Sequence, residues 1–211
     1  MLPLASIENV VFHVSNVLRT PVLIVALVAV ALVVVECGAL GVELVRRGRR
    51  NPDRLQNAAT HAREAIVEGD RASAAKYLGI AVSSAAMWKA VLRVVALTGL
   101  PEASIRVPKT IADFDIGSLR RLERTRVLVR VGPALGLMGT LIPLSPALSG
   151  LASGKVDQLT SNLRVAFSVT VLGLLVGAVA FGISLVRDRL YAQDLSDLTF
   201  IAATLEGEAS A

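Results

Sequence analysis

Residues 127–151 read VLVRVGPALGLMGTLIPLSPALSGL, and residues 163–186 read LRVAFSVTVLGLLVGAVAFGISLV. Each stretch is long enough to cross the hydrocarbon core of a bilayer as a helix, and neither contains an acidic residue. A polar connection around Lys155 separates them, so the sequence predicts a transmembrane hairpin. Thr140 and Thr170 each lie about fifteen residues from Lys155, or roughly 22 Å along a helix, and are predicted to lie at one depth.

Composition favours a membrane protein over an ordinary soluble domain. The chain has 211 residues, of which 54% are hydrophobic and 4% aromatic, and its mean hydropathy is +0.63. The net charge is +5, but the basic residues gather beside apolar stretches at 46–50, 120–126 and 187–189, which is typical of cytoplasmic flanks and argues against nucleic-acid binding. The single cysteine, Cys37, excludes a disulfide within the chain.

The fold class predicted is all-α, an integral membrane protein with three transmembrane helices and a helical cytoplasmic domain. The expected segments are an amphipathic N-terminal segment (1–19), a first transmembrane helix (20–45), the helical cytoplasmic domain (46–126), a second transmembrane helix (127–151), a third transmembrane helix (163–186) and a cytoplasmic C-terminal tail (187–211).

Residues 81–100 are nearly long enough to form a fourth span. Lys89 and Arg93 fall in the middle, however, and each would cost about 2.5–3.5 kcal/mol at the centre of an inserted helix. Insertion would also separate the basic regions 46–50 and 120–126 across the membrane. We therefore expect a buried helix of the cytoplasmic domain here. With three spans, we expect the N-terminus outside and the C-terminus in the cytoplasm. The protein is then a multi-pass protein of the plasma (inner) membrane.

Helix starts and breaks divide the cytoplasmic domain. Pro52 follows an asparagine and precedes an aspartate, which predicts a helix beginning there. The Gly-Asp pair that ends at Asp70 predicts a break and a second start. Pro101 and Pro108 suggest a loop, with a new helix expected near Asp115 that continues into the second span.

Small residues and prolines mark the hairpin. They are Gly132, Pro133, Gly136, Gly139 and Pro143 in the second span, and Gly173 and Gly177 in the third. Gly132, Gly136 and Thr140 recur every four residues, which gives one face that another helix can approach closely. On this pattern alone, plain helix packing is the stronger interpretation. A threonine in such a helix commonly donates its hydroxyl hydrogen bond to a backbone carbonyl of the same helix. The hydroxyl can also donate to a carboxylate or accept a hydrogen bond from a protonated carboxyl group.

Few other residues point to chemistry. Glu36 is the one acid deep in a predicted span, with Glu43 nearer its cytoplasmic end, and an intramembrane acid is a functional candidate by default. Glu36 could instead pair with an arginine or stay protonated. His13 and His61 are solitary and are expected in ordinary surface or core positions. No nucleophile–base pair, metal-ligand cluster or phosphate loop is present, so we expect neither an enzyme nor a bound cofactor or metal.

The hairpin carries a recognisable combination of motifs. GLMGT at 136–140, followed about thirty residues later by AFSVTVLGL at 166–174, resembles the core of the MotA/TolQ/ExbB proton-channel family over roughly residues 122–186. Three spans with a long cytoplasmic loop resemble the TolQ/ExbB branch.

The resemblance implies a channel-forming subunit of an ion-driven membrane motor. Five copies would form a homo-oligomer in the lipid bilayer around two single-span helices of an ExbD-, TolR- or MotB-like partner, which supplies an intramembrane aspartate. The family's pore threonines map onto Thr140 and Thr170. Val165 stands where ExbB-type proteins commonly carry a glutamate, so that group's role is absent or relocated. The alternative is a scaffold or assembly protein without ion conduction. The ion and the driven process, such as protein transport, stay open.

Overall fold

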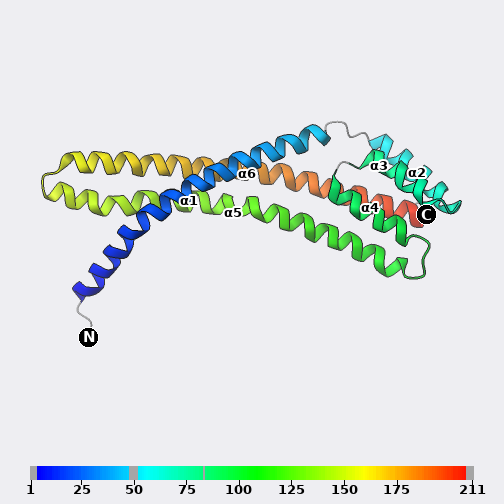
Figure 1. The fold of residues 1–211 in the computed structure, drawn as a ribbon, viewed down its shortest axis with the longest axis horizontal. Helices are drawn as coiled ribbons and strands as arrows, with labels where there is room; N and C mark the ends of the chain where they lie inside the picture. The colour runs from blue at the N-terminus through cyan, green and yellow to red at the C-terminus, as the bar shows by residue number, and fades with distance from the viewer. Residues whose placement is uncertain (1–3, 48–51, 83, 208–211) are drawn as a thin grey trace. The chain divides into compact units, whose positions relative to one another are not determined.

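The computed structural model describes residues 4–47, 52–82 and 84–207. Within these ranges the chain is helical apart from short connections and has no strand, which confirms the all-α fold class. The helices are α1 (Leu4–Arg47), α2 (Pro52–Val67), α3 (Arg71–Ala81), α4 (Ala85–Leu97), α5 (Ala103–Ala152) and α6 (Val156–Glu206) (Figure 1). By length and composition α1, α5 and α6 could each cross a membrane, in agreement with the three predicted spans.

The chain divides into two compact units. The described parts of Met1–Ala39 and Arg124–Ser184 form one, which we call the hairpin unit, and those of Leu40–Glu123 and Leu185–Ala211 form the other, the helical unit. Each contains its own buried apolar cluster. The transmembrane and cytoplasmic boundaries expected from the sequence remain predictions.

In the hairpin unit, α5 and α6 run side by side and are joined by a turn at residues 153–155 (Figure 1). Gly154 in this turn has a φ of 76°, a backbone conformation that glycine adopts without steric cost. The part of α1 that belongs to this unit packs on both helices, with Val22 and Val33 in the shared apolar cluster. Before these residues, Arg19 donates a hydrogen bond to Asn162 of α6 at 3.0 Å.

In the helical unit, α2, α3 and α4 pack with the beginning of α5 and the end of α6. The helix α4 has only 13 residues, and six of them are buried, which confirms a core helix rather than a fourth span. The predicted C-terminal tail continues α6 as far as Glu206. Leu198 and Ile201 of this segment are fully buried in the same core.

Two of the predicted helix starts are confirmed. Helix α2 begins at Pro52, and α3 begins directly after Asp70. The Asp70 carboxylate accepts hydrogen bonds from the backbone N–H groups of Ala72 and Ser73 at 3.1 and 3.0 Å, so it caps the helix. Hydrogen bonding from Ser73 lowers the pKa of Asp70 below its ordinary value.

The helix start expected near Asp115 is wrong, because α5 already begins at Ala103 and contains Pro108. A proline this close to a helix start removes one backbone hydrogen bond, to the carbonyl of the solvent-exposed residue Ser104. Burial of Val107 and of Phe114 in the helical core favours the helix over a loop in this segment.

A buried ion-pair cluster joins the ends of two helices in the helical unit. The Arg47 guanidinium at the end of α1 donates to both carboxylate oxygens of Asp194 in α6, at 2.7 and 2.6 Å. It also donates to Glu43 at 3.1 Å, and Arg187 Nε lies 3.8 Å from the second Glu43 oxygen. The Arg47 and Asp194 side chains are only 6% and 3% exposed, so each charge relies on the other for compensation.

Removing one partner of this pair should be costly. We expect Asp194→Asn to lower the free energy of unfolding of the detergent-solubilised protein by about 3–5 kcal/mol, because the buried Arg47 charge loses its closest counter-ion and keeps only the partly exposed Glu43. Glu102→Gln is the control, since Glu102 pairs with Arg106 at the exposed surface and should matter little. Equal losses in the two variants, measured by denaturant titration, would contradict the structural role of the cluster.

Candidate functional site

The two helices of the hairpin touch through their backbones at a group of glycines. A Cβ atom added at Gly173 would lie 2.5 Å from the Gly132 carbonyl oxygen and 2.8 Å from the Gly136 backbone. One added at Gly132 would lie 2.7 Å from the Gly173 oxygen and 2.8 Å from the Gly177 nitrogen. Real Cβ atoms do not come so close to other atoms, so only glycine fits at these two positions. Of the predicted face, Gly132 and Gly136 lie in the contact between α5 and α6.

Other small residues and prolines border this contact. A Cβ at Gly139 would clash with the Val169 side chain, and one at Gly177 would meet the Pro133 ring at 2.8 Å. Pro133 is exposed apart from this contact with α6, Pro143 is buried, and α5 stays helical through both prolines.

Thr170 connects the two helices by a hydrogen bond. Its Oγ1 donor lies 3.1 Å from the Gly136 carbonyl oxygen of α5 and 3.1 Å from the Ala166 carbonyl oxygen of its own helix. The single hydroxyl proton is shared between these acceptors. Thr170 is half-buried, and its first structural effect is to hold α6 against α5.

Thr140 has a more open environment. Its hydroxyl donates to the Leu137 carbonyl oxygen at 2.8 Å, and the residue is half-exposed in this chain. The Thr170 hydroxyl bonds to the Gly136 carbonyl, and the Thr140 hydroxyl bonds to the carbonyl of the next residue, Leu137. These two acceptors are about 1.5 Å apart along α5, which is consistent with the predicted common level of the two hydroxyls.

Both hydroxyls are thus donors to backbone carbonyls, and their lone pairs stay available as acceptors. In this arrangement a threonine can accept a hydrogen bond from a protonated carboxyl group or a water molecule, or contribute an oxygen to a cation. Donation to a carboxylate requires the hydroxyl to leave its carbonyl first. The geometry therefore favours the protonated form of an approaching acid.

The remaining candidates lie apart from this contact. Glu36 is half-buried on α1, and Val165 is half-buried on α6. His13 is exposed, and His61 is exposed with its Nδ1 3.2 Å from Glu64. Among the described residues, no three His, Cys, Asp or Glu side chains are grouped to hold a metal ion.

Sequence reasoning missed several polar contacts. Arg19 and Asn162, like Arg47 and Asp194, are far apart in the chain. No local pattern signals that such residues meet. From the sequence, the charged residues among them indicated only solvent-exposed flanks of the apolar segments.

The glycine contact predicts a large difference between two similar substitutions in α6. Gly173→Ala should lower the free energy of unfolding by about 1–3 kcal/mol, because its methyl group would meet backbone atoms that cannot move aside easily. Gly182→Ala is the control, since no heavy atom lies within 4 Å of its added Cβ. Denaturant titration of both variants checks this, and similar stabilities would show that the helices can separate at little cost.

Comparison with known proteins gives one match to a family model, over the hairpin and its flanks. Residues 111–196 match the MotA/TolQ/ExbB proton channel family. No curated protein gives a significant match to the chain. The matched range contains both threonines and the whole glycine contact, and it suggests a proton-channel subunit. The match does not distinguish the TolQ/ExbB branch from the others.

Proposed function

We propose that this protein is the channel-forming subunit of an ion-driven membrane motor of the TolQ/ExbB type. In this proposal several copies, five by analogy with the family, surround the helices of a single-span ExbD-, TolR- or MotB-like partner in the plasma membrane. The N-terminus lies outside and the C-terminus in the cytoplasm. The partner helix contributes the carboxyl group that takes up and releases the ion.

The observation that carries the proposal is the family match over the hairpin. Residues 111–196 include the glycine contact with Thr140 and Thr170, yet residues 127–151 and 163–186 contain no acid. A proton path needs a group that binds and releases a proton, and a hydroxyl with an ordinary pKa does not do so. The absence of an acid from this hairpin is therefore consistent with a carboxyl group supplied by a different polypeptide.

The mechanism follows from the donors and acceptors of the site. A protonated carboxyl group on the partner helix donates to the free lone pair of a threonine, which lowers the cost of its burial. Loss of the proton removes that hydrogen bond and favours movement of the carboxylate toward water or a basic group. One charge crossing 100 mV supplies only about 2.3 kcal/mol, so several ions must be coupled to each working cycle.

The two threonines contribute differently in this mechanism. The Thr140 hydroxyl is exposed and bonds within its own helix, so Thr140 is the better candidate for contact with the partner helix. Thr170 uses its hydroxyl to join α6 to the Gly136 carbonyl, so it acts mainly by positioning α5. Substitution of Thr140 should therefore change ion flow directly, whereas substitution of Thr170 should act through the packing of α5 and α6.

Substitution of Thr140 tests the direct role. We expect Thr140→Val to reduce proton flux about tenfold with unchanged assembly, since it removes one hydrogen bond worth about 1.4 kcal/mol to the transferring group. Thr140→Ser should retain flux. The double variant Thr140→Val/Thr170→Val should lose ion-dependent output altogether. Flux is measured with a pH-sensitive dye in vesicles containing the chain and its partner. Normal flux in Thr140→Val would refute the pore role of this residue.

Co-purification distinguishes a motor subunit from a scaffold, the function that helix packing by glycine alone would favour. Gentle solubilisation of the native membrane and affinity capture of this chain should yield a single-span protein with an aspartate within its apolar segment. Native mass spectrometry of the complex should give several copies of this chain for each pair of partners. Recovery of this chain alone, or with proteins that lack a membrane-embedded acid, would favour the scaffold.

A further inference from the structure

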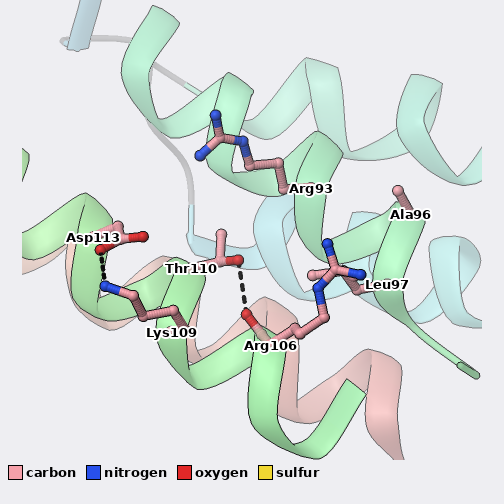
Figure 2. A pocket seen from close by; sticks show the side chains of 7 residues that line it. All are labelled: Arg93, Ala96, Leu97, Arg106, Lys109, Thr110 and Asp113. Carbon is pink, nitrogen blue, oxygen red and sulfur yellow. Dashed lines mark hydrogen bonds and ion pairs between the residues drawn. The ribbon is translucent and has the colours of Figure 1, made fainter. Parts of the chain in front are cut away.

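A groove in the helical unit lies between α4 and the beginning of α5. It consists of two adjoining hollows of about 380 and 360 Å³, which share Arg93, Thr110 and Asp113 in their linings. Figure 2 shows the first hollow, with Arg93 on α4 and Arg106, Lys109, Thr110 and Asp113 on α5. The proposed function makes no use of this groove.

The groove is strongly basic. Its ionisable lining residues are Lys89 and Arg93 from α4, and Arg106, Lys109, Asp113 and Arg121 from α5. The one acid in this lining, Asp113, forms an ion pair with Lys109. Five basic residues and one acid leave the lining with four more positive than negative charges. Outside this lining, Glu102 pairs with Arg106 at the exposed surface.

Two cations stand out because nothing in the described chain neutralises them. Lys89 and Arg93 are one helical turn apart on α4, both are exposed, and neither has an ion pair or hydrogen bond to another described residue. Arg121 is different, since it donates to Ser118 and lies over the Tyr191 ring at 5.2 Å. The unneutralised charge therefore centres on the α4 side of the groove.

The shape of the groove limits what could bind there. Along α5, Arg106 and Arg121 are fifteen residues apart, or about 22 Å, so the cations form a line and do not converge on one point. Apolar side chains such as Ala90, Leu97 and Phe114 contribute to the lining between them. A single phosphate group would use only part of this line, and a flat bilayer surface cannot enter a hollow.

We propose that this groove binds an acidic segment of another polypeptide. Carboxylates spaced along an extended chain would pair with Lys89, Arg93 and Arg106 in turn, while smaller apolar side chains rest on the floor. Charge complementarity of this kind accelerates association and selects the partner more than it adds affinity. The inference does not depend on ion conduction, because it concerns only the helical unit.

Binding of a model peptide tests this proposal. The full-length protein in nanodiscs of zwitterionic lipid is titrated into a fluorescein-labelled peptide of alternating Glu and Ala, and anisotropy gives the Kd. Lys89→Gln/Arg93→Gln should weaken binding about tenfold, and Arg54→Gln/Lys76→Gln, which removes the same charge from exposed sites on α2 and α3, should weaken it less than about twofold. A peptide of alternating Gln and Ala should not bind.

Two results would overturn the proposal. Equal weakening by the two double variants would mean that the peptide senses only net charge. The second result is that the Glu peptide does not bind, while vesicles containing phosphatidylglycerol do bind and their binding depends on Lys89 and Arg93. That result would assign these residues to the membrane surface. Neither result bears on proton flux, so this proposal and the channel function can fail separately.

Discussion

The direct backbone contact between α5 and α6 is the constraint on which the hairpin depends. Lipid tails are as apolar as the helix surfaces, so helices in a bilayer associate through close packing and hydrogen bonds. Glycines at 132, 136, 173 and 177 allow that packing. A side chain at 132 or 173 would clash with backbone atoms of the other helix, one at 177 would clash with the Pro133 ring, and one at 136 would be tight against Thr170. The contact also brings the Thr170 hydroxyl to the Gly136 carbonyl, so the hairpin's polar group is positioned by the same feature that holds the helices together.

The two units handle polar groups in different ways. In the hairpin unit the threonines donate to backbone carbonyls and carry no charge, which suits an apolar environment and leaves acceptor lone pairs for an incoming acid. In the helical unit a buried cluster of paired charges surrounds Arg47, whereas Lys89 and Arg93 are exposed in the α4–α5 groove and unpaired by any described residue. The buried cluster around Arg47 contributes to stability, and the α4–α5 groove is where we propose that an acidic partner binds.

Much of the fold could be predicted because the relevant signals are local. Length and hydropathy identified the spans, four-residue spacing identified the glycine face, and Lys89 with Arg93 identified α4 as a core helix. Pro108 was misleading, because a proline near a helix start costs one hydrogen bond and packing of Val107 and Phe114 outweighs it. The burial of Asp194 against Arg47, and the hydrogen bond from Thr170 to the Gly136 carbonyl, depend on tertiary register, which no pattern in a single sequence encodes.

In the proposed complex, hydroxyl-lined hairpins surround an acid carried by another chain. A density map of the native complex, purified with its partners, would reveal this arrangement. We expect a foreign helix on the central axis, with its carboxyl group within hydrogen-bond reach of Thr140. A map in which the axis holds no foreign helix and the hydroxyls of Thr140 and Thr170 face lipid would contradict it.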